Sequence, residues 1–440
     1  KKSTPKYWAI AGILIILAAN IAEFFGMPLL SFNSRGMLRF DAFTLHFNTL
    51  AFACTLLFFL LNGRDFEKIG EHVSEYFSLI FFVLCGVAIS SSFNTLLLLF
   101  LGIEIMSIPL YILTASNKRN LKGNEAALKY FLMGAFSTGL LLMGIALIYG
   151  GNSAGSFFIN DIHLGTGNMP LLIAAGLVLL VISMSFKVSA APFHFWAPDV
   201  YDGAPAVISS FMMTIVKIAA FVAFFRLFQN AFGAIQSQWQ MLIVVITAAT
   251  LLIGNITAVF QQSVKRMLAY SSISHAGFMM FALFAMNDLA KEGLLIYAVA
   301  YSLATIGIFA ILIKMSDYSI EGFNGLGKKQ PALAFTATIF LLSLTGIPLT
   351  AGFIGKFYVL MGAVNNGHHL WLVILAVLCA AVGAFYYFRV IQAIYFKEPK
   401  EGVNENIEVS SSFKYLLYIT VALIILVGIM PGLVIDWIYY

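Results

Sequence analysis

The chain has 440 residues, of which 61% are hydrophobic and only 10% are charged. Soluble domains carry about 25% charged residues, so this composition excludes a soluble globular domain and indicates an integral membrane protein. The net charge of +5 is distributed over many loops, which indicates a topology signal and not a basic patch that binds nucleic acid.

Thirteen segments are long and apolar enough to cross a bilayer, since a spanning helix needs about 20 apolar residues. The first lacks a small-residue cleavage pattern, so we expect a membrane span and not a signal peptide. We therefore predict an all-α integral membrane protein with about 13 transmembrane helices. In chain order the segments cover residues 7–25, 43–61, 76–93, 95–115, 126–149, 170–189, 204–228, 239–260, 267–286, 291–315, 331–363, 370–396 and 414–435.

Two of these spans are predicted to be broken. Residues 186–198 read FKVSAAPFHFWAP, and residues 344–356 read LTGIPLTAGFIGK. Proline interrupts a helix, and broken backbone at membrane depth needs cover from protein or water. Because the second broken span is the fifth span after the first, the two run in opposite directions, and we expect two inverted repeats, each with a discontinuous helix. The predicted layout is N-terminal helices in 1–94, a first repeat in 95–228 broken near 186–203, a second in 239–396 broken near 344–356, and a C-terminal loop and helix in 397–440.

The basic residues between the spans are distributed very unevenly. When the sides alternate from the N-terminus, sixteen Lys and Arg residues fall on one side and four, Arg35, Arg39, Arg226 and Lys291, on the other. Cytoplasmic loops carry the excess of such residues. We therefore expect a cytoplasmic N-terminus and a C-terminus on the opposite side.

The sequence has no pattern for a redox cofactor or a metal. Cys54, Cys85 and Cys379 are far apart and lie in apolar runs, so they do not form an iron–sulfur or zinc set. No facing pair of helical histidines suggests haem, and no glycine-rich phosphate loop follows a strand. We expect no cofactor and no redox chemistry in this chain.

Isolated charges inside the predicted spans are the candidate functional residues. Glu104 is the only charge in its span, and an isolated charge at the bilayer centre costs about 2.5 to 3.5 kcal/mol on insertion scales, so it should face a partner. Lys217 lies too deep to reach water easily. Lys187 and Lys356 adjoin the two helix breaks. We expect a proton relay, the alternatives being a structural ion pair for Glu104 and a cation that satisfies open carbonyls at a helix end for the two lysines.

For three further residues, the sequence does not decide between a functional and a structural role. Lys129 lies near the start of its span, so it could extend to water or belong to the relay. His275 stands among Ser271, Ser272 and Ser274 and could exchange protons with lysines on both sides or serve only packing. Arg389, close to its helix end, is predicted to be an interfacial anchor.

Three motifs resemble a known family: PFHFWAPDVYDGAP at residues 192–205, VKRMLAYSSISHAG at 264–277 and GIPLTAGFIGKF at 346–357. They are similar to the antiporter-like membrane subunits of respiratory complex I, the NADH-quinone oxidoreductase, and the PDVYDGAP form favours the subunit N branch. The wider family includes the large subunits of Mrp-type cation/proton antiporters. The resemblance covers essentially the whole chain.

The resemblance implies a bundle of fourteen helices, so one helix is expected to precede Lys1. It implies that Glu104 is the buried glutamate, Lys187 its partner, Lys217 the central lysine and Lys356 the lysine of the second broken helix. It also places Lys129 in the polar axis and His275 between two half-channels.

By the same resemblance, the partners are other membrane-arm subunits of complex I, together with lipids, and FMN, iron–sulfur clusters and quinone belong to partner subunits. The location implied is the bacterial inner membrane, with a cytoplasmic N-terminus and a periplasmic C-terminus. Two alternatives stay open: a cation/proton antiporter without NADH-linked partners, and a structural subunit whose lysines only hold the bundle together.

Overall fold

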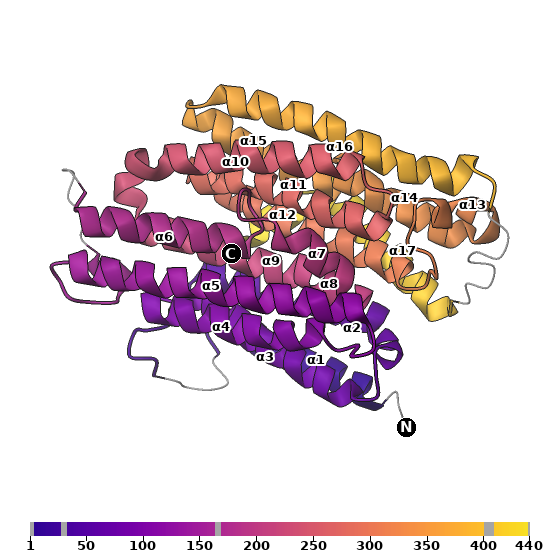
Figure 1. Cartoon of the computed structure of the whole chain (residues 1–440), viewed down its shortest axis with the longest axis horizontal. Helices are drawn as coiled ribbons and strands as arrows, with labels where there is room; N and C mark the ends of the chain where they lie inside the picture. Colours follow the sequence, from indigo (N-terminus) through magenta and orange to yellow (C-terminus); the bar gives the residue numbers. More distant parts are fainter. Residues whose placement is uncertain (1–3, 28–32, 163–168, 400–408, 439–440) are drawn as a thin grey trace.

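The computed structural model describes residues 4–27, 33–162, 169–399 and 409–438. Within these residues the chain forms a bundle of long helices that run side by side along the longest axis (Figure 1). The longer helices are α1 (Thr4–Phe24), α2 (Ala42–Asn62), α3 (Val73–Ser92), α4 (Leu96–Thr114), α5 (Leu121–Gly151), α6 (Leu171–Lys187), α9 (Lys217–Ala231), α10 (Gln236–Val259), α11 (Val264–Ala285), α12 (Asp288–Leu312), α14 (Pro331–Thr345), α15 (Ala351–Asn366), α16 (Leu370–Phe396) and α17 (Ser411–Ile429). Short helices are α7 (Trp196–Gly203), α8 (Ala206–Phe211), α13 (Leu326–Lys329) and α18 (Gly432–Ile438).

The prediction of about thirteen crossings agrees with the helices of the described chain. Eleven helices are long and apolar enough to span a bilayer. Two shorter apolar helices, α6 and α14, each continue after a break into a second helix, α7 and α15. Counted as one crossing each, these broken spans bring the number to thirteen.

Both predicted breaks are present, and they have similar backbone conformations. The first lies between Lys187 and Trp196, where Ser189 has a positive φ of 61°. The second lies between Thr345 and Ala351, where Gly346 has a φ of 86°. A left-handed residue cannot continue a right-handed helix, so each span stops there. Alternation of the crossings makes the two broken spans run in opposite directions, as expected for inverted repeats.

The centre of the bundle is formed by the continuous segment α8–α9, by α11 and by α12, whose apolar windows are almost completely buried by other helices. In Figure 1, α5 and α6 lie on one side of this centre, and α16 runs along an outer edge. Helices α10 and α11 approach closely because position 254 is glycine, where a Cβ would lie 2.6 Å from the backbone nitrogen of Ser274. Polar side chains on α11 therefore face the middle of the molecule.

We call the membrane face on which α1 begins the basic face, because the loops there carry most of the Lys and Arg residues. Arg226 lies toward the opposite face. The sequence pattern placed it in a loop, but it belongs to α9 and is buried. Its guanidinium donates 2.9 Å hydrogen bonds to Asp41 Oδ2, Thr44 Oγ1 and the Phe93 carbonyl oxygen. This contact ties α9 to the first residues of α2 and the end of α3.

Asp41 precedes α2 and caps it by accepting a hydrogen bond from the Thr44 backbone nitrogen. Burial raises the pKa of the Asp41 carboxyl, but the Arg226 guanidinium and the hydrogen bonds from Thr44 outweigh it and hold the pKa below its usual value. The Asp41–Arg226 pair is therefore ionised over the neutral pH range.

Candidate functional site

Glu104 lies in the middle of α4, where it accepts a 2.7 Å hydrogen bond from Thr138 Oγ1 of α5. Its next neighbour on the same face of α4 is Ser107, since residues three apart on a helix are adjacent. Ser107 Oγ accepts a 3.1 Å hydrogen bond from Lys187 Nζ at the end of α6. Glu104 and Lys187 therefore contact neighbouring positions of one helix.

Glu104 and Lys187 do not form a direct ion pair, as their charged atoms are not within 4 Å of one another. The carboxylate nevertheless acts electrostatically on the lysine. Lys187 donates to a hydroxyl and not to the open carbonyls of its helix end, so the alternative of a carbonyl-binding cation does not describe its contacts. A modest shift of α4 or α6 would change the separation of the two charges.

Lys217 is buried at the first residue of α9, directly after a single π-helical turn at Met212–Val216. Its Nζ donates hydrogen bonds to the backbone carbonyl of Ser272 (2.8 Å) and to Ser272 Oγ (3.0 Å) on α11. The aromatic ring of Tyr201 lies 5.8 Å from the ammonium. Isolated π turns inside α-helices occur frequently at functional sites, and this one sets the direction of Lys217.

His275 lies one turn further along α11, on the same face as Ser272. Its Nδ1 is 2.6 Å from the Tyr297 hydroxyl, and its Nε2 is 3.1 Å from the Tyr387 hydroxyl. Tyr387 also hydrogen-bonds Ser271. The imidazole is therefore held at both nitrogens by hydroxyls that can donate or accept.

Lys356 lies in the second turn of α15, just after the second break. Its Nζ donates hydrogen bonds to the carbonyl oxygens of Leu344 (3.0 Å) and Thr345 (2.8 Å), which end α14, and lies 4.8 Å from the ring of Phe278. Gly346 makes room for it, because a Cβ there would lie 2.9 Å from the Lys356 side chain. The alternative interpretation, a cation that satisfies open carbonyls at a helix end, therefore matches the contacts of Lys356.

Helix α11 connects the two central lysines. Ser272, His275 and Phe278 follow one another at intervals of three residues, about 4.5 Å of helix rise each, so they form one face. Lys217 contacts the first of them and Lys356 the last. Both lysines act electrostatically on the imidazole between them.

Lys129 is separate from this buried group. Its side chain is 41% exposed and forms ion pairs with Glu125 (2.7 Å) and with Asp199 of α7 (2.9 Å). Arg266 binds the other oxygen of Asp199 at 3.0 Å. The snorkelling interpretation therefore agrees with its exposure, and its membership of the relay stays a prediction.

A cavity of about 660 Å³ opens on the basic face between the ends of several helices. Its lining includes Lys122, Asp202 and Lys265. Lys265, expected in a loop, is the second residue of α11 and is buried, and its ammonium donates to the backbone carbonyls of Asp202 and Ala204. This cavity lies at the start of α11 and opens toward the basic face.

Sequence reasoning missed most of the partners of the candidate residues. Thr138, Tyr297 and Tyr387 are ordinary hydroxyl side chains on other helices, and only their position in the fold distinguishes them. The contacts of Arg389 were also missed. Arg389 lies near the end of its own helix, as predicted, but its guanidinium also donates to the carbonyls of Val259 and Gln261 at the end of α10.

The site has no cluster suited to a metal: in the parts of the chain that the structure describes, no three His, Cys, Asp or Glu side chains converge. Its chemistry rests on ammonium, imidazole, carboxylate and hydroxyl groups alone. All of these donate or accept protons.

Residues 93–383 match the family described as NADH:quinone oxidoreductase/Mrp antiporter, transmembrane. The NADH-quinone oxidoreductase subunit N 1 of Solibacter usitatus is 36% identical over 99% of this chain and 91% of its own length. A chain in the structure of respiratory complex I from Thermus thermophilus with bound aureothin is 32% identical, with a TM-score of 0.84 over 98% of this chain and 93% of that one. The Mrp complex from Dietzia sp. has a chain of the same fold, with a TM-score of 0.86 over 99% of this chain and 92% of that one, at 18% identity. This chain therefore belongs to the NADH:quinone oxidoreductase/Mrp antiporter family, as an antiporter-like membrane subunit of the subunit N type.

Proposed function

We propose that this chain translocates protons in the membrane arm of a complex I, along a relay formed by Glu104, Lys187, Lys217, His275 and Lys356. Lys129 joins the relay from the side of the basic face, through its pair with Asp199. Water molecules between the side chains complete the chain of hydrogen bonds. Quinone reduction in partner subunits supplies the free energy.

One observation carries this proposal: none of the lysines Lys187, Lys217 and Lys356 forms an ion pair within the described chain. Lys187 binds a hydroxyl, Lys217 a carbonyl and a hydroxyl, and Lys356 two carbonyls. A permanent ion pair would keep a lysine protonated, whereas burial among neutral oxygens disfavours its charged form. Lysines held in this way can take up and release a proton.

The supply of hydroxyls supports a hydrogen-bonded path. Ser185 Oγ, near Lys187, and Ser210 Oγ, two turns before Lys217, are buried without a protein hydrogen-bond partner in the described structure. Buried polar groups are normally satisfied, and internal water is the usual means when protein partners are lacking. These hydroxyls would bind water next to the lysines.

The relay also depends on a change of the Glu104–Lys187 separation. Their charges interact without direct contact, so moving them together stabilises the Lys187 ammonium and moving them apart favours proton release toward Lys217. Coupling to electron transfer then requires only a shift of helices α4 to α6.

The partners proposed are neighbouring membrane-arm subunits, and FMN, iron–sulfur clusters and quinone would reside in partner subunits. We further propose that the chain lies in a bacterial inner membrane with its basic face toward the cytoplasm, since cytoplasmic loops carry the excess of Lys and Arg. The cavity lined by Asp202 and Lys265 would then admit protons from the cytoplasm.

The test is NADH-driven proton uptake by inverted membrane vesicles, measured together with NADH-quinone electron transfer. Lys217→Ala removes the central titratable group, and Lys217→Arg keeps a cation that does not deprotonate in proteins. Both should lose proton uptake. Lys118→Ala, in an exposed loop, is the matched control and should behave as wild type.

Full proton uptake by an assembled Lys217→Ala complex would refute the relay and leave the lysines a structural role. Sodium uptake that replaces proton uptake would instead support a cation/proton antiporter. Loss of uptake in both Lys217 variants, with normal assembly and a normal control, is the result we expect.

A further inference from the structure

A second cavity, of about 420 Å³, lies on the basic face at the periphery of the bundle, away from the relay residues. It is formed by the first turns of α1, the end of α2, the end of α12 and the start of α17. Its polar lining is cationic, with Lys6, Arg64 and Lys314. Its remaining walls include Ile10, Leu61 and Leu416, so the cavity joins a positive end to an apolar one.

The positive charge in this cavity is only partly balanced. Lys314 forms a 2.6 Å ion pair with Asp65, but Lys68 binds the same carboxylate at 2.9 Å. Lys6 Nζ donates to the backbone carbonyl of Leu60 at 3.1 Å, which adds no negative charge. The Arg64 side chain is exposed and makes no hydrogen bond or ion pair with any residue that the structure describes. Among the residues that the structure describes, at least two of these cations therefore lack a counter-ion.

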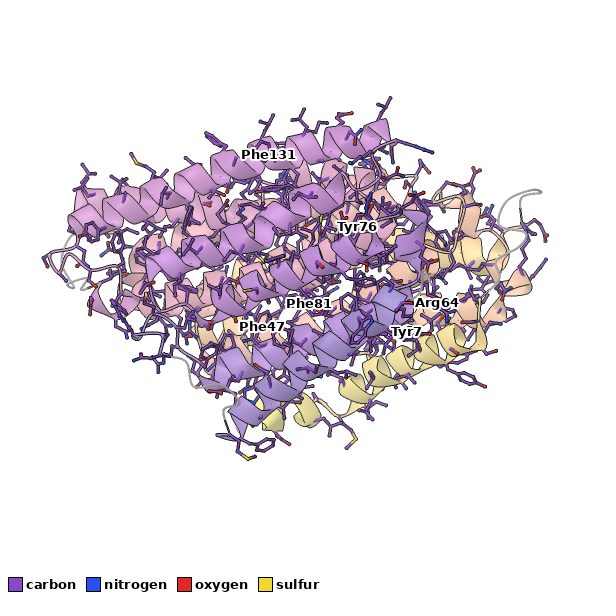
Figure 2. The ribbon with its side chains drawn as sticks, turned by 90° about the horizontal axis from the view of Figure 1, so that it is seen from below. Tyr7, Phe47, Arg64, Tyr76, Phe81 and Phe131 are labelled. Carbon is purple, nitrogen blue, oxygen red and sulfur yellow. The ribbon has the colours of Figure 1, made fainter. Side chains whose placement is uncertain are left out.

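The surroundings of the cavity mark the level of the membrane interface. Tyr7 and Trp8 on α1 and Tyr415 and Tyr418 on α17 are all exposed, with Trp8 75% exposed. Trp and Tyr are enriched where a membrane protein meets the lipid headgroups. In Figure 2, Tyr7 and Arg64 lie near one another, at the end of the bundle where α1 and α17 run alongside.

We propose that this cavity binds the phosphate of an anionic phospholipid, with Arg64 and Lys6 as the ligands of the headgroup. Arg presents a fork of donors that matches phosphate oxygens, and basic pockets between transmembrane helices on the cytoplasmic side are suited to anionic headgroups. The acyl chains would run along Ile10 and Leu416 toward the membrane interior.

A lipid fits this site better than a soluble anion for two reasons. The cavity has apolar walls that continue into the lipid-facing surfaces of α1 and α17, where Ile15 and Ile419 are exposed. A free phosphate would leave those walls uncovered, whereas a phospholipid covers both parts. The proposal is independent of proton translocation, because none of the relay residues lines this cavity.

The experiment uses the assembled complex in phosphatidylcholine vesicles that contain a small fraction of phosphatidylglycerol with a photoreactive acyl chain. After illumination, mass spectrometry maps the adducts along α1 and α17. Each Lys or Arg near a membrane surface contributes about 1 kcal/mol to anionic lipid binding, so Arg64→Gln should reduce labelling about fivefold. Lys118→Gln is the matched control, since Lys118 is an exposed lysine of another loop on the basic face and lines neither cavity.

Arg64→Lys keeps the charge and should retain most of the labelling, which guards against a loss caused by misfolding alone. Equal labelling by a phosphatidylcholine probe, or unchanged labelling in Arg64→Gln, would overturn the proposal. Displacement of the probe by inorganic phosphate at physiological concentration would show that the occupant is a soluble anion and would also overturn it. Proton uptake should stay normal in Lys118→Gln whatever the lipid result.

Discussion

Substitutions at Lys356 distinguish most clearly between two roles for this residue, a proton relay and a helix cap. Its ammonium binds the two carbonyls that end α14, so both roles are compatible with its contacts. Lys356→Met removes both hydrogen bonds and leaves two carbonyls buried. An unsatisfied buried acceptor costs about 1 to 3 kcal/mol, so the change should destabilise the chain by about 2 to 6 kcal/mol. Lys356→Gln keeps an amide donor on a shorter side chain, and about 1 to 2 kcal/mol is expected from the loss of one bond.

The two variants have different consequences for proton uptake under the relay hypothesis. Neither methionine nor glutamine titrates, so both should slow uptake on the order of 10²-fold, the scale on which a positioned acid or base contributes. If Lys356 only caps the helix, Lys356→Gln would retain uptake. Thermal unfolding of the purified chain in detergent measures the first effect, and NADH-driven uptake in vesicles measures the second.

Arg389 offers a matched control for Lys356, since it caps the carbonyls at the end of α10 in the same manner. Arg389→Gln should lower the unfolding temperature without a comparable loss of proton uptake. Full uptake in Lys356→Gln, with stability close to that of wild type, would refute the relay role of Lys356.

Two further predictions concern single hydrogen-bonded contacts. Thr138→Val removes the 2.7 Å hydrogen bond to Glu104, which is worth about 1.5 to 3 kcal/mol for a charged acceptor. Proton uptake should therefore fall in Thr138→Val and stay near the wild-type rate in Thr138→Ser, which keeps the hydroxyl. Equal rates in the two variants would contradict a role for this contact. Asp41→Asn should lower the unfolding temperature at pH 7, because it leaves Arg226 without its carboxylate. Burial raises the pKa of the Asp41 carboxyl, but Arg226 and Thr44 lower it further, so the pKa in the folded chain lies below the unfolded value of about 4. The ionised carboxylate therefore stabilises the fold fully above about pH 4. This stabilisation is lost as the pH falls through the folded pKa. The wild-type and Asp41→Asn unfolding temperatures should therefore converge in acid, and a constant difference would contradict this assignment.

The helices and their breaks could be predicted because they depend on local sequence. Long apolar runs specify spans, and Pro192 and Pro348 in short polar stretches specify the two interruptions. The candidate charges were equally visible, since Glu104 or Lys217 stands alone in an apolar segment. Each of these signals lies within one helix, so no knowledge of packing was needed.

The partners of those charges could not be predicted, because they come from other helices. Asp199 is 70 positions from Lys129, and Ser272 is 55 positions from Lys217. Serine and aspartate occur in many places, and only helix packing selects the one that meets a given lysine. The π turn before Lys217 was also missed, since no residue type marks such a turn in the way proline marks a break.

For the proposed relay, the contacts imply a direction that the sequence did not show. Lys187, Lys217 and Lys356 all bind neutral oxygens, but only Lys187 has a carboxylate of the proposed relay acting on it, that of Glu104. In the proposed relay, a change in electrostatic energy would therefore enter at the Glu104 end and would pass to Lys217 and Lys356 by proton transfer along the α11 face. Since like charges repel, a proton on one group of the proposed relay would disfavour a proton on its neighbour. This repulsion would make the protonation states alternate along the proposed relay.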